Sequence, residues 1–116
     1  MILSGQVFAH EWTPTYPELK QSHVEGVLVV DMFLFNARDD ISYYEISVFD
    51  AEWNNLPFAA EMRLIQMDYL SRKNVSIYIR EEDRDRVTYI CSDSKIISNG
   101  QTQSSISSRI CSKIRR

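Results

Sequence analysis

The spacing of apolar residues changes twice along this chain of 116 residues, and these changes constrain its fold most strongly. Through residues 24–50 apolar residues either run together or alternate with polar ones, the two-residue period typical of β-strands. After Asn54 the period becomes helical, and at Val75 the alternation returns. The helical stripe consists of Phe58, Met62, Ile65 and Tyr69. The sequence therefore predicts a mainly β protein with one helix near residues 56–73.

Five segments have the composition and alternation of strands. They are Leu3–His10, Val24–Phe35, Ile41–Asp50, Val75–Arg80 and Arg86–Cys91. With the helix between the third and fourth strands, the order is β-β-β-α-β-β, which matches a five-stranded, antiparallel OB-like barrel. A helix packed on an antiparallel sheet of another topology would have the same order. In either fold we expect Met62 and Ile65 to anchor the core from the helix.

Composition divides the chain into an OB-like barrel domain, residues 1–96, and a serine-rich basic tail, residues 97–116. Eight of the 14 serines fall between Ser92 and Ser112. Three isoleucines lie four residues apart, as in a narrow helical stripe: Ile106, Ile110 and Ile114. The tail is therefore interpreted as partly disordered or as a short helix.

Charge is distributed unevenly, although the net charge is only −3. All 16 acidic residues and nine of the 13 Lys and Arg lie in residues 1–96, which gives this part a net charge of −7. Such an acidic body argues against a protein that coats nucleic acid by charge alone. No apolar run is longer than Val27–Val30, far below the ~18 residues of a membrane span. We therefore expect no membrane partner.

The chain has two cysteines, Cys91 and Cys111, which is not the pattern of a disulfide-rich secreted protein. They either form one bridge in an oxidising compartment or serve as small apolar residues in a reduced cytosol, and the second interpretation is favoured. The first residues, Met1–Gly5, lack the basic and apolar regions of a signal peptide. These features predict a cytoplasmic protein, or a secreted one if a signal peptide has been removed.

Residues 43–80 carry a more specific similarity. A strand ending in an apolar-aromatic pair leads to a helix with an Ala-Glu pair, which closes with Tyr-Leu before a strand rich in Val and Ile. These parts are Tyr44–Asp50, Ala60-Glu61, Tyr69-Leu70 and Val75–Ile79. In this order they resemble the core of bacterial single-stranded DNA-binding proteins, which are OB folds. The resemblance implies an OB barrel that binds single-stranded nucleic acid.

Single-stranded nucleic acid is held by aromatic side chains that stack on bases and by cations along the backbone. On an OB barrel these groups lie on the second and third strands and the flanking loops. The candidate stacking residues are Trp12, Phe33, Phe35, Tyr43 and Tyr78, and the candidate cations are Lys20 and Arg80. Core or interface positions are the alternative interpretation of Phe33 and Phe35.

No pattern indicates a metal site, a cofactor or a catalytic centre. His10, His23 and the two cysteines are the soft metal ligands, and no two of them lie at short spacing. Three glycines are too few for a phosphate-binding loop. We therefore expect no metal, no cofactor and no enzymatic activity.

The sequence thus favours a non-enzymatic OB-fold binding module for single-stranded nucleic acid. Two alternatives stay open. One is a protein-interaction subunit that uses an exposed strand or the Ile106–Ile114 stripe, and the other is an oligosaccharide-binding barrel of the secreted toxin B-subunit type. The expected partner is single-stranded nucleic acid or another protein, and self-association into a homo-oligomer is a further interpretation.

Overall fold

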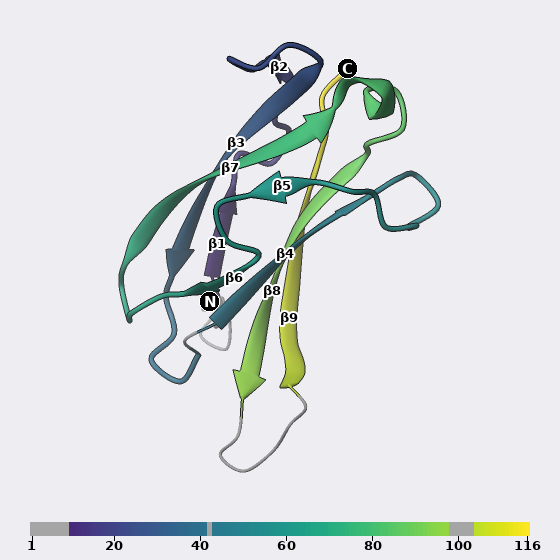
Figure 1. Ribbon diagram of the computed structural model, residues 1–116. Coiled ribbons are helices and arrows are strands. Elements are labelled where there is room, and N and C mark those ends of the chain that lie inside the picture. The colour runs from purple at the N-terminus through teal and green to yellow at the C-terminus, as the bar shows by residue number, and fades with distance from the viewer. Residues whose placement is uncertain (1–9, 42, 98–103) are drawn as a thin grey trace, which may run out of the picture.

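Two antiparallel sheets face each other across one apolar core in the computed structural model, which describes residues 10–41, 43–97 and 104–116 (Figure 1). The first sheet has the strand order β1-β3-β7-β5, with β2 beside β3, and the second has the order β6-β4-β8-β9. The elements are β1 (His10–Thr13), β2 (Lys20–Gln21), β3 (Val27–Asn36), β4 (Tyr43–Phe49), β5 (Ala59–Ala60), β6 (Leu64–Gln66), β7 (Arg72–Arg80), the 3-10 turn η1 (Glu81–Asp83), β8 (Tyr89–Ile97) and β9 (Ser104–Lys113). The molecule is a β-sandwich.

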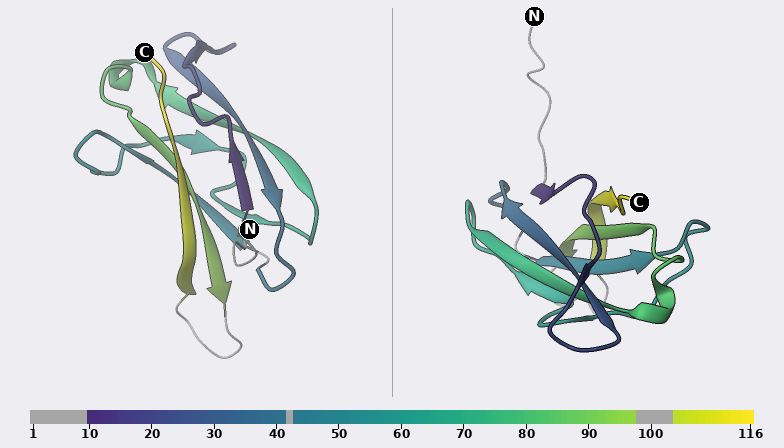
Figure 2. Two further views of the ribbon diagram at one scale, coloured as in Figure 1. Left: turned by 180° about the vertical axis from the view of Figure 1, so that it is seen from behind. Right: turned by 90° about the horizontal axis from the view of Figure 1, so that it is seen from above.

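The two longest strands of the first sheet, β3 and β7, pair from Val27 with Arg80 to Phe35 with Arg72. On the other edge of β3, β1 and β2 lie end to end: β1 covers residues 33–36 and β2 covers residues 28–29. In the second sheet β4 pairs with β8, and β8 pairs with β9 as a long antiparallel ribbon (Figure 2). In this layout, neighbouring strands cover some strand edges over more of their length than others.

Alternate residues of the central strands point into the space between the sheets. They include Leu28, Val30, Met32 and Leu34 of β3, Tyr44, Ile46 and Val48 of β4, and Val75, Ile77 and Ile79 of β7. A strand places every second side chain on the same face, so these runs fill the core while their neighbours face outward. The predicted strands at 24–35, 41–50 and 75–80 are confirmed, and so is the mainly β fold class.

The helix predicted near residues 56–73 is wrong, because this segment forms the two short strands β5 and β6. β5 pairs with β7 in the first sheet and β6 with β4 in the second, so the chain changes sheets between them. Ile65 is 1% exposed, which confirms its core role, whereas Met62 is 42% exposed and is not a core residue. Met62 and Ile65 are three residues apart, an odd number, so they point to opposite sides of an extended chain.

The five-stranded OB-like barrel is also wrong, because each sheet keeps its own edges and the described strands do not close into a barrel. Residues 104–113, assigned from the sequence to a tail with a helical stripe, form β9 and pair with β8. A spacing of four residues is also a multiple of two, so Ile110 and Ile114 share one face of a strand as they would of a helix. Both pack against the core.

The connection after β1 joins the two sheets. The carbonyl oxygen of Thr15 accepts a hydrogen bond from the backbone N–H of Lys113 at 3.0 Å, and that of Pro17 accepts one from Arg115 at 2.8 Å. Because both partners advance in the same direction, this segment runs parallel to the end of β9. The predicted first strand, Leu3–His10, lies outside the described residues except for His10, which begins β1.

A disulfide links Cys91 of β8 to Cys111 of β9, which are directly paired residues. The bridge was the less favoured of the two interpretations drawn from the sequence. Beside it, the Arg109 guanidinium makes two hydrogen bonds to Asp93, at 2.7 and 2.9 Å, and lies 5.2 Å from the centre of the Phe49 ring. On the outer face of the second sheet, β8 and β9 are therefore linked by a covalent bond and by an ion pair.

Asn36, at the end of β3, is fully buried and joins several parts of the fold. Its Nδ2 donates to the carbonyl oxygens of Ile41, Met67 and Asp68 at 2.9, 3.2 and 3.2 Å. Its Oδ1 accepts a hydrogen bond from the hydroxyl of Tyr44, and burial raises the pKa of this tyrosine to about 12. The side chain thus holds β3, β4 and the β6–β7 connection together.

His10 is a second buried polar residue, 1% exposed, with its ring centre 4.7 Å from that of Tyr44. Its Nε2 lies 3.2 Å from the carbonyl oxygen and 2.6 Å from the hydroxyl of Ser92, whereas its Nδ1 has no hydrogen-bond partner among the described residues. Burial lowers the pKa of His10 to about 4, because the core disfavours the charged ring. The imidazole is therefore neutral at pH 7.

Candidate functional site

The outer face of the first sheet gathers five of the seven residues that the sequence singles out as ligand-binding. They are Lys20, Phe33, Phe35, Tyr78 and Arg80. The aromatic rings are half-buried and contact neighbours on their own chain. The Arg72 guanidinium lies 5.2 Å from the centre of the Phe35 ring, and His23 meets Tyr78 edge-on with 6.1 Å between ring centres.

The other two candidates, Trp12 and Tyr43, lie elsewhere. Trp12 is 3% exposed and its Nε1 donates to the carbonyl oxygen of Ile90 at 3.0 Å, so its ring is part of the core. Tyr43 belongs to β4 of the second sheet, opposite Lys95. The seven residues therefore do not form one site.

Arg80 is already engaged by acidic side chains. Its Nε donates to Asp83 at 3.0 Å, and the guanidinium also pairs with Glu82 at 3.3 Å. Asp83 is 1% exposed and accepts a further hydrogen bond from Arg86 at 3.1 Å. This arrangement leaves Arg80 with little positive charge to offer a phosphate group.

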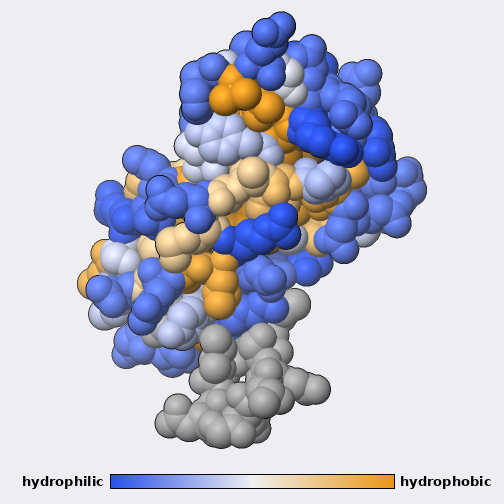
Figure 3. All heavy atoms as spheres, viewed as in Figure 1, coloured by the Kyte–Doolittle hydropathy of each residue, from blue (hydrophilic) through white to orange (hydrophobic). Residues whose placement is uncertain are grey.

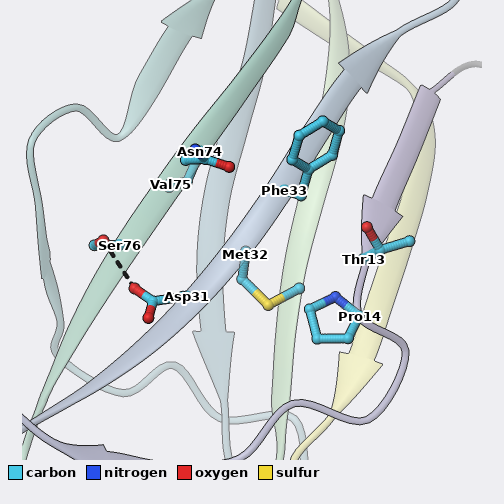
Figure 4. Close-up of a pocket in the computed structure, with 8 residues that line it drawn as sticks. All are labelled: Thr13, Pro14, Asp31, Met32, Phe33, Asn74, Val75 and Ser76. Atoms are coloured by element: carbon cyan, nitrogen blue, oxygen red, sulfur yellow. Dashed lines mark hydrogen bonds between the residues drawn. The ribbon is translucent and has the colours of Figure 1, made fainter.

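A hollow of about 550 Å³ lies on the outer face of the first sheet. Figure 4 shows the residues of β1, β3 and β7 and the adjoining loop that line it: Thr13, Pro14, Asp31, Met32, Phe33, Asn74, Val75 and Ser76. Its one carboxylate, that of Asp31, accepts a hydrogen bond from the Ser76 hydroxyl at 3.0 Å. Asp31 is the only titratable residue among these lining residues.

A second hollow, of about 310 Å³, lies beside the same part of β7. Its lining residues are Glu61, Met62, Ile65, Lys73, Asn74, Val75, Ser76 and Tyr78. β5 pairs only with Ile77 and Tyr78 of β7 before the chain leaves for the other sheet. Among the described residues, no strand pairs with the outer edge of Arg72–Ser76. We call this edge together with the second hollow the β7 groove.

Apolar side chains line the β7 groove and its surroundings. Ile65 and Val75, 1% and 6% exposed, contribute from the second and the first sheet, respectively. Met62, also in the lining, is 42% exposed, whereas Leu64, 46% exposed, lies outside the lining. Figure 3 shows apolar side chains across the face that carries β5 and β6, between polar regions. The groove therefore combines an uncovered strand edge with a mixed lining, in which Met62, Ile65 and Val75 are the apolar residues.

Lys73 also lines the groove, at a half-buried position of β7. The salt bridges of the described residues do not include it. Sequence reasoning missed the groove, because it placed Met62 on a core-facing helix and did not single out Lys73. The available signal was the short alternation Ile65-Gln66-Met67, in which Ile65 and Met67 point inward and Gln66 outward.

Two classes of feature are not found in the described part of the chain. No helix there is long and apolar enough to cross a membrane. No three His, Cys, Asp or Glu side chains gather there in a way that would hold a metal ion.

No family model matches the chain, and no curated protein matches it. Its fold is similar to that in a solved structure, the crystal structure of the periplasmic chaperone SfaE, with a TM-score of 0.54 and 20% sequence identity. The match covers 91% of this chain and 56% of the chaperone, so the chain spans just over half of that protein's length. At this identity the likeness shows the fold.

The function expected from the OB fold, binding of single-stranded nucleic acid, is overturned by this finding. The chain has the two-sheet architecture found in part of a periplasmic chaperone rather than that of an OB barrel. The second and third predicted strands, which would form the base-stacking face of an OB barrel, lie in different sheets as β3 and β4, and two of the five aromatic candidates lie away from the rest.

Proposed function

We propose that this chain is a non-enzymatic, protein-binding module with a chaperone-like fold, and that it holds an extended segment of another protein in the β7 groove. The observation that carries the proposal is the uncovered edge of Arg72–Ser76 beside a hollow to which Met62, Ile65 and Val75 contribute apolar surface. Backbone N–H and C=O groups on an edge strand pair readily with a strand from another chain. Side chains of that strand would fill the hollow.

The contrast between the two edges of the first sheet supports this proposal. On the β3 edge, β1 and β2 together cover six residues. On the β7 edge, β5 stops after two residues, although the chain continues nearby through Met62. Folded proteins usually cover or shorten an exposed strand edge, because it invites pairing with other chains. An uncovered edge beside apolar side chains is therefore a binding feature.

We place the protein outside the cytoplasm. The Cys91–Cys111 disulfide fits an oxidising compartment, because thiols in the cytosol are kept reduced. The structural neighbour is a periplasmic chaperone, which agrees with this location. Both observations support the secreted interpretation over the cytoplasmic one.

The proposal is tested by the ability of the intact protein to keep an unfolding protein in solution. Citrate synthase is unfolded by heat in its presence, and light scattering is followed, with an immunoglobulin domain of similar size as control. We expect this chain to lower the scattering in proportion to its concentration, with no effect of the control. Equal scattering with both proteins at every concentration would overturn the chaperone-like function.

A further inference from the structure

The uncovered part of β7 presents two rows of side chains to an added strand. Lys73 and Val75 occupy the positions that face the other sheet, and Arg72, Asn74 and Ser76 face outward. A strand that pairs with β7 alternates in the same way, so every second side chain enters the space beside Lys73 and Val75. The remaining side chains lie on the outer face of the sheet.

The inner row of such a strand meets apolar surface. Ile65 and Val75 approach it from the two sheets, and Met62 lies at the rim. Apolar side chains placed here would remove the exposed part of Met62 from water, which is favourable in proportion to the area covered. The groove therefore selects a segment with apolar residues at alternate positions.

One end of the groove is basic. Lys73 lines this end, is half-buried and takes part in none of the ion pairs among the described residues. The acidic residue of the lining, Glu61, follows Ala60, the partner of Ile77, and so belongs to the opposite end. A partly buried ammonium is stabilised by a carboxylate brought next to it.

We propose that the partner segment is an extended, acidic-apolar strand, with apolar side chains at alternate positions and a carboxylate that meets Lys73. This inference rests on the proposed function and names the class of partner for the same groove. The uncovered edge, Arg72–Ser76, spans about 17 Å, which sets the paired length at about five residues.

The probes are three labelled heptapeptides of alternating Val and Thr, which differ only at the residue that would meet Lys73: Asp, Thr or Lys. Fluorescence anisotropy measures their dissociation constants for the intact, disulfide-bonded protein. We expect the Asp peptide to bind about tenfold more tightly than the Thr peptide, and the Lys peptide to bind most weakly. The Lys73→Glu variant should reverse this order. Equal affinities for the three peptides would overturn the role of Lys73.

Two matched variants test the groove itself. Met62→Glu places a charge in the lining and should weaken all three peptides, whereas Leu64→Glu places one on an exposed residue outside the lining and should leave the affinities unchanged. Thermal unfolding checks that both variants fold. Equal affinities in Met62→Glu and the parent protein would overturn the assignment of the groove.

The same variants separate this inference from the proposed function. If Met62→Glu still suppresses citrate synthase aggregation while the peptides fail to bind the parent protein, the chaperone-like activity stands and the assignment of the groove as its binding site fails. If neither activity is found, both proposals fail. Concentration-dependent self-association that is lost in Met62→Glu would make a second copy the occupant and would overturn the acidic-apolar partner.

Discussion

At the scale of single residues, the two buried polar side chains at the same end of the sandwich differ in how well they are satisfied. Asn36 uses both its amide nitrogen and its oxygen in hydrogen bonds to three separate parts of the chain. His10 has one ring nitrogen without a partner among the described residues. The first residue should therefore contribute mainly to stability, and the second to the dependence of stability on pH.

We expect His10 to make the protein less stable below pH 6.5. The pKa of His10 is about 4 in the folded state, below its ordinary value of 6.5. As the pH falls through 6.5, the unfolded chain takes up a proton that the folded chain does not, so folding weakens until about pH 4. Between pH 7 and pH 5 this effect amounts to about 2 kcal/mol. Urea denaturation at the two pH values measures it.

The His10→Gln variant should lose most of this pH dependence, whatever its stability at pH 7. The matched control is His23→Gln, which changes the exposed histidine and should keep the dependence. A pH dependence in His10→Gln as large as in the parent protein would assign the effect to other groups.

Replacing Asn36 should be costly, because its partners are buried. Asn36→Ala leaves the carbonyl groups of Ile41 and Met67 and the Tyr44 hydroxyl without this partner. We expect the free energy of unfolding to fall by about 3 kcal/mol. The exposed Asn74→Ala should change it by less than about 0.5 kcal/mol. Similar urea midpoints for the two variants would argue against the role of Asn36.

At the scale of elements, the passage from β5 to β6 determines the shape of the groove. The chain pairs with β7 over two residues and then crosses to β4. This crossing places Ile65 in the core and leaves Met62 exposed where the chain passes from one sheet to the other. It also withdraws the strand that would otherwise cover the rest of the β7 edge.

Truncation of Ile65 and of Met62 to alanine should show that the first residue is in the core and the second is not. We expect Ile65→Ala to lower the free energy of unfolding by about 2–5 kcal/mol, because it leaves a cavity in the core. Met62→Ala should change it by less than about 0.5 kcal/mol, since the side chain is 42% exposed. Chemical denaturation of both variants compares them. If Met62→Ala lowers the free energy of unfolding by a similar amount, Met62 is a core residue after all.

The long strands are predictable from the sequence, because β-branched and aromatic residues repeat with a period of two in Val24–Phe35 and Ile41–Asp50. The crossover is not, since two strands as short as β5 and β6 leave only a run of three alternating residues, and the apolar residues of this segment also fall at helical intervals. β9 is not recognisable from the sequence, because it is rich in serine and a strand is recognised mainly by its apolar face.

The site was harder to predict than the strands. Phe33, Phe35 and Tyr78 were singled out from the sequence, and the structure places them on one surface because they alternate with core positions of β3 and β7. The β7 groove depends instead on where a neighbouring strand stops. That is a long-range property of the sheet, and it leaves no mark on the residues of β7 themselves.

At the scale of the whole molecule, one apolar core holds the two sheets together. Within the second sheet, the disulfide also joins β8 to β9. The Cys91–Cys111 bridge joins residues 20 apart in the sequence. It limits the conformations open to the unfolded chain and so favours the folded state. The oxidation state of this pair should therefore affect the stability of the entire domain.

We expect reduction of the disulfide to lower the free energy of unfolding by about 3 kcal/mol, the value for a closed loop of this length. Urea denaturation with and without a reducing agent measures the change. The double variant Cys91→Ala, Cys111→Ala is the control, because its stability should not respond to the reducing agent. An equal response of the parent protein and the double variant would exclude the bridge as the cause.

The parallel run of Thr15 and Pro17 beside Lys113 and Arg115 has a mechanical consequence. Tension that pulls the start of β1 and the end of β9 apart acts along both segments in opposite directions. The two hydrogen bonds, at 3.0 and 2.8 Å, then bear the load together in shear instead of opening one after the other. Forced unfolding is governed by the barrier to the first rupture. A domain pulled along this axis should therefore resist more force than one pulled across its strands.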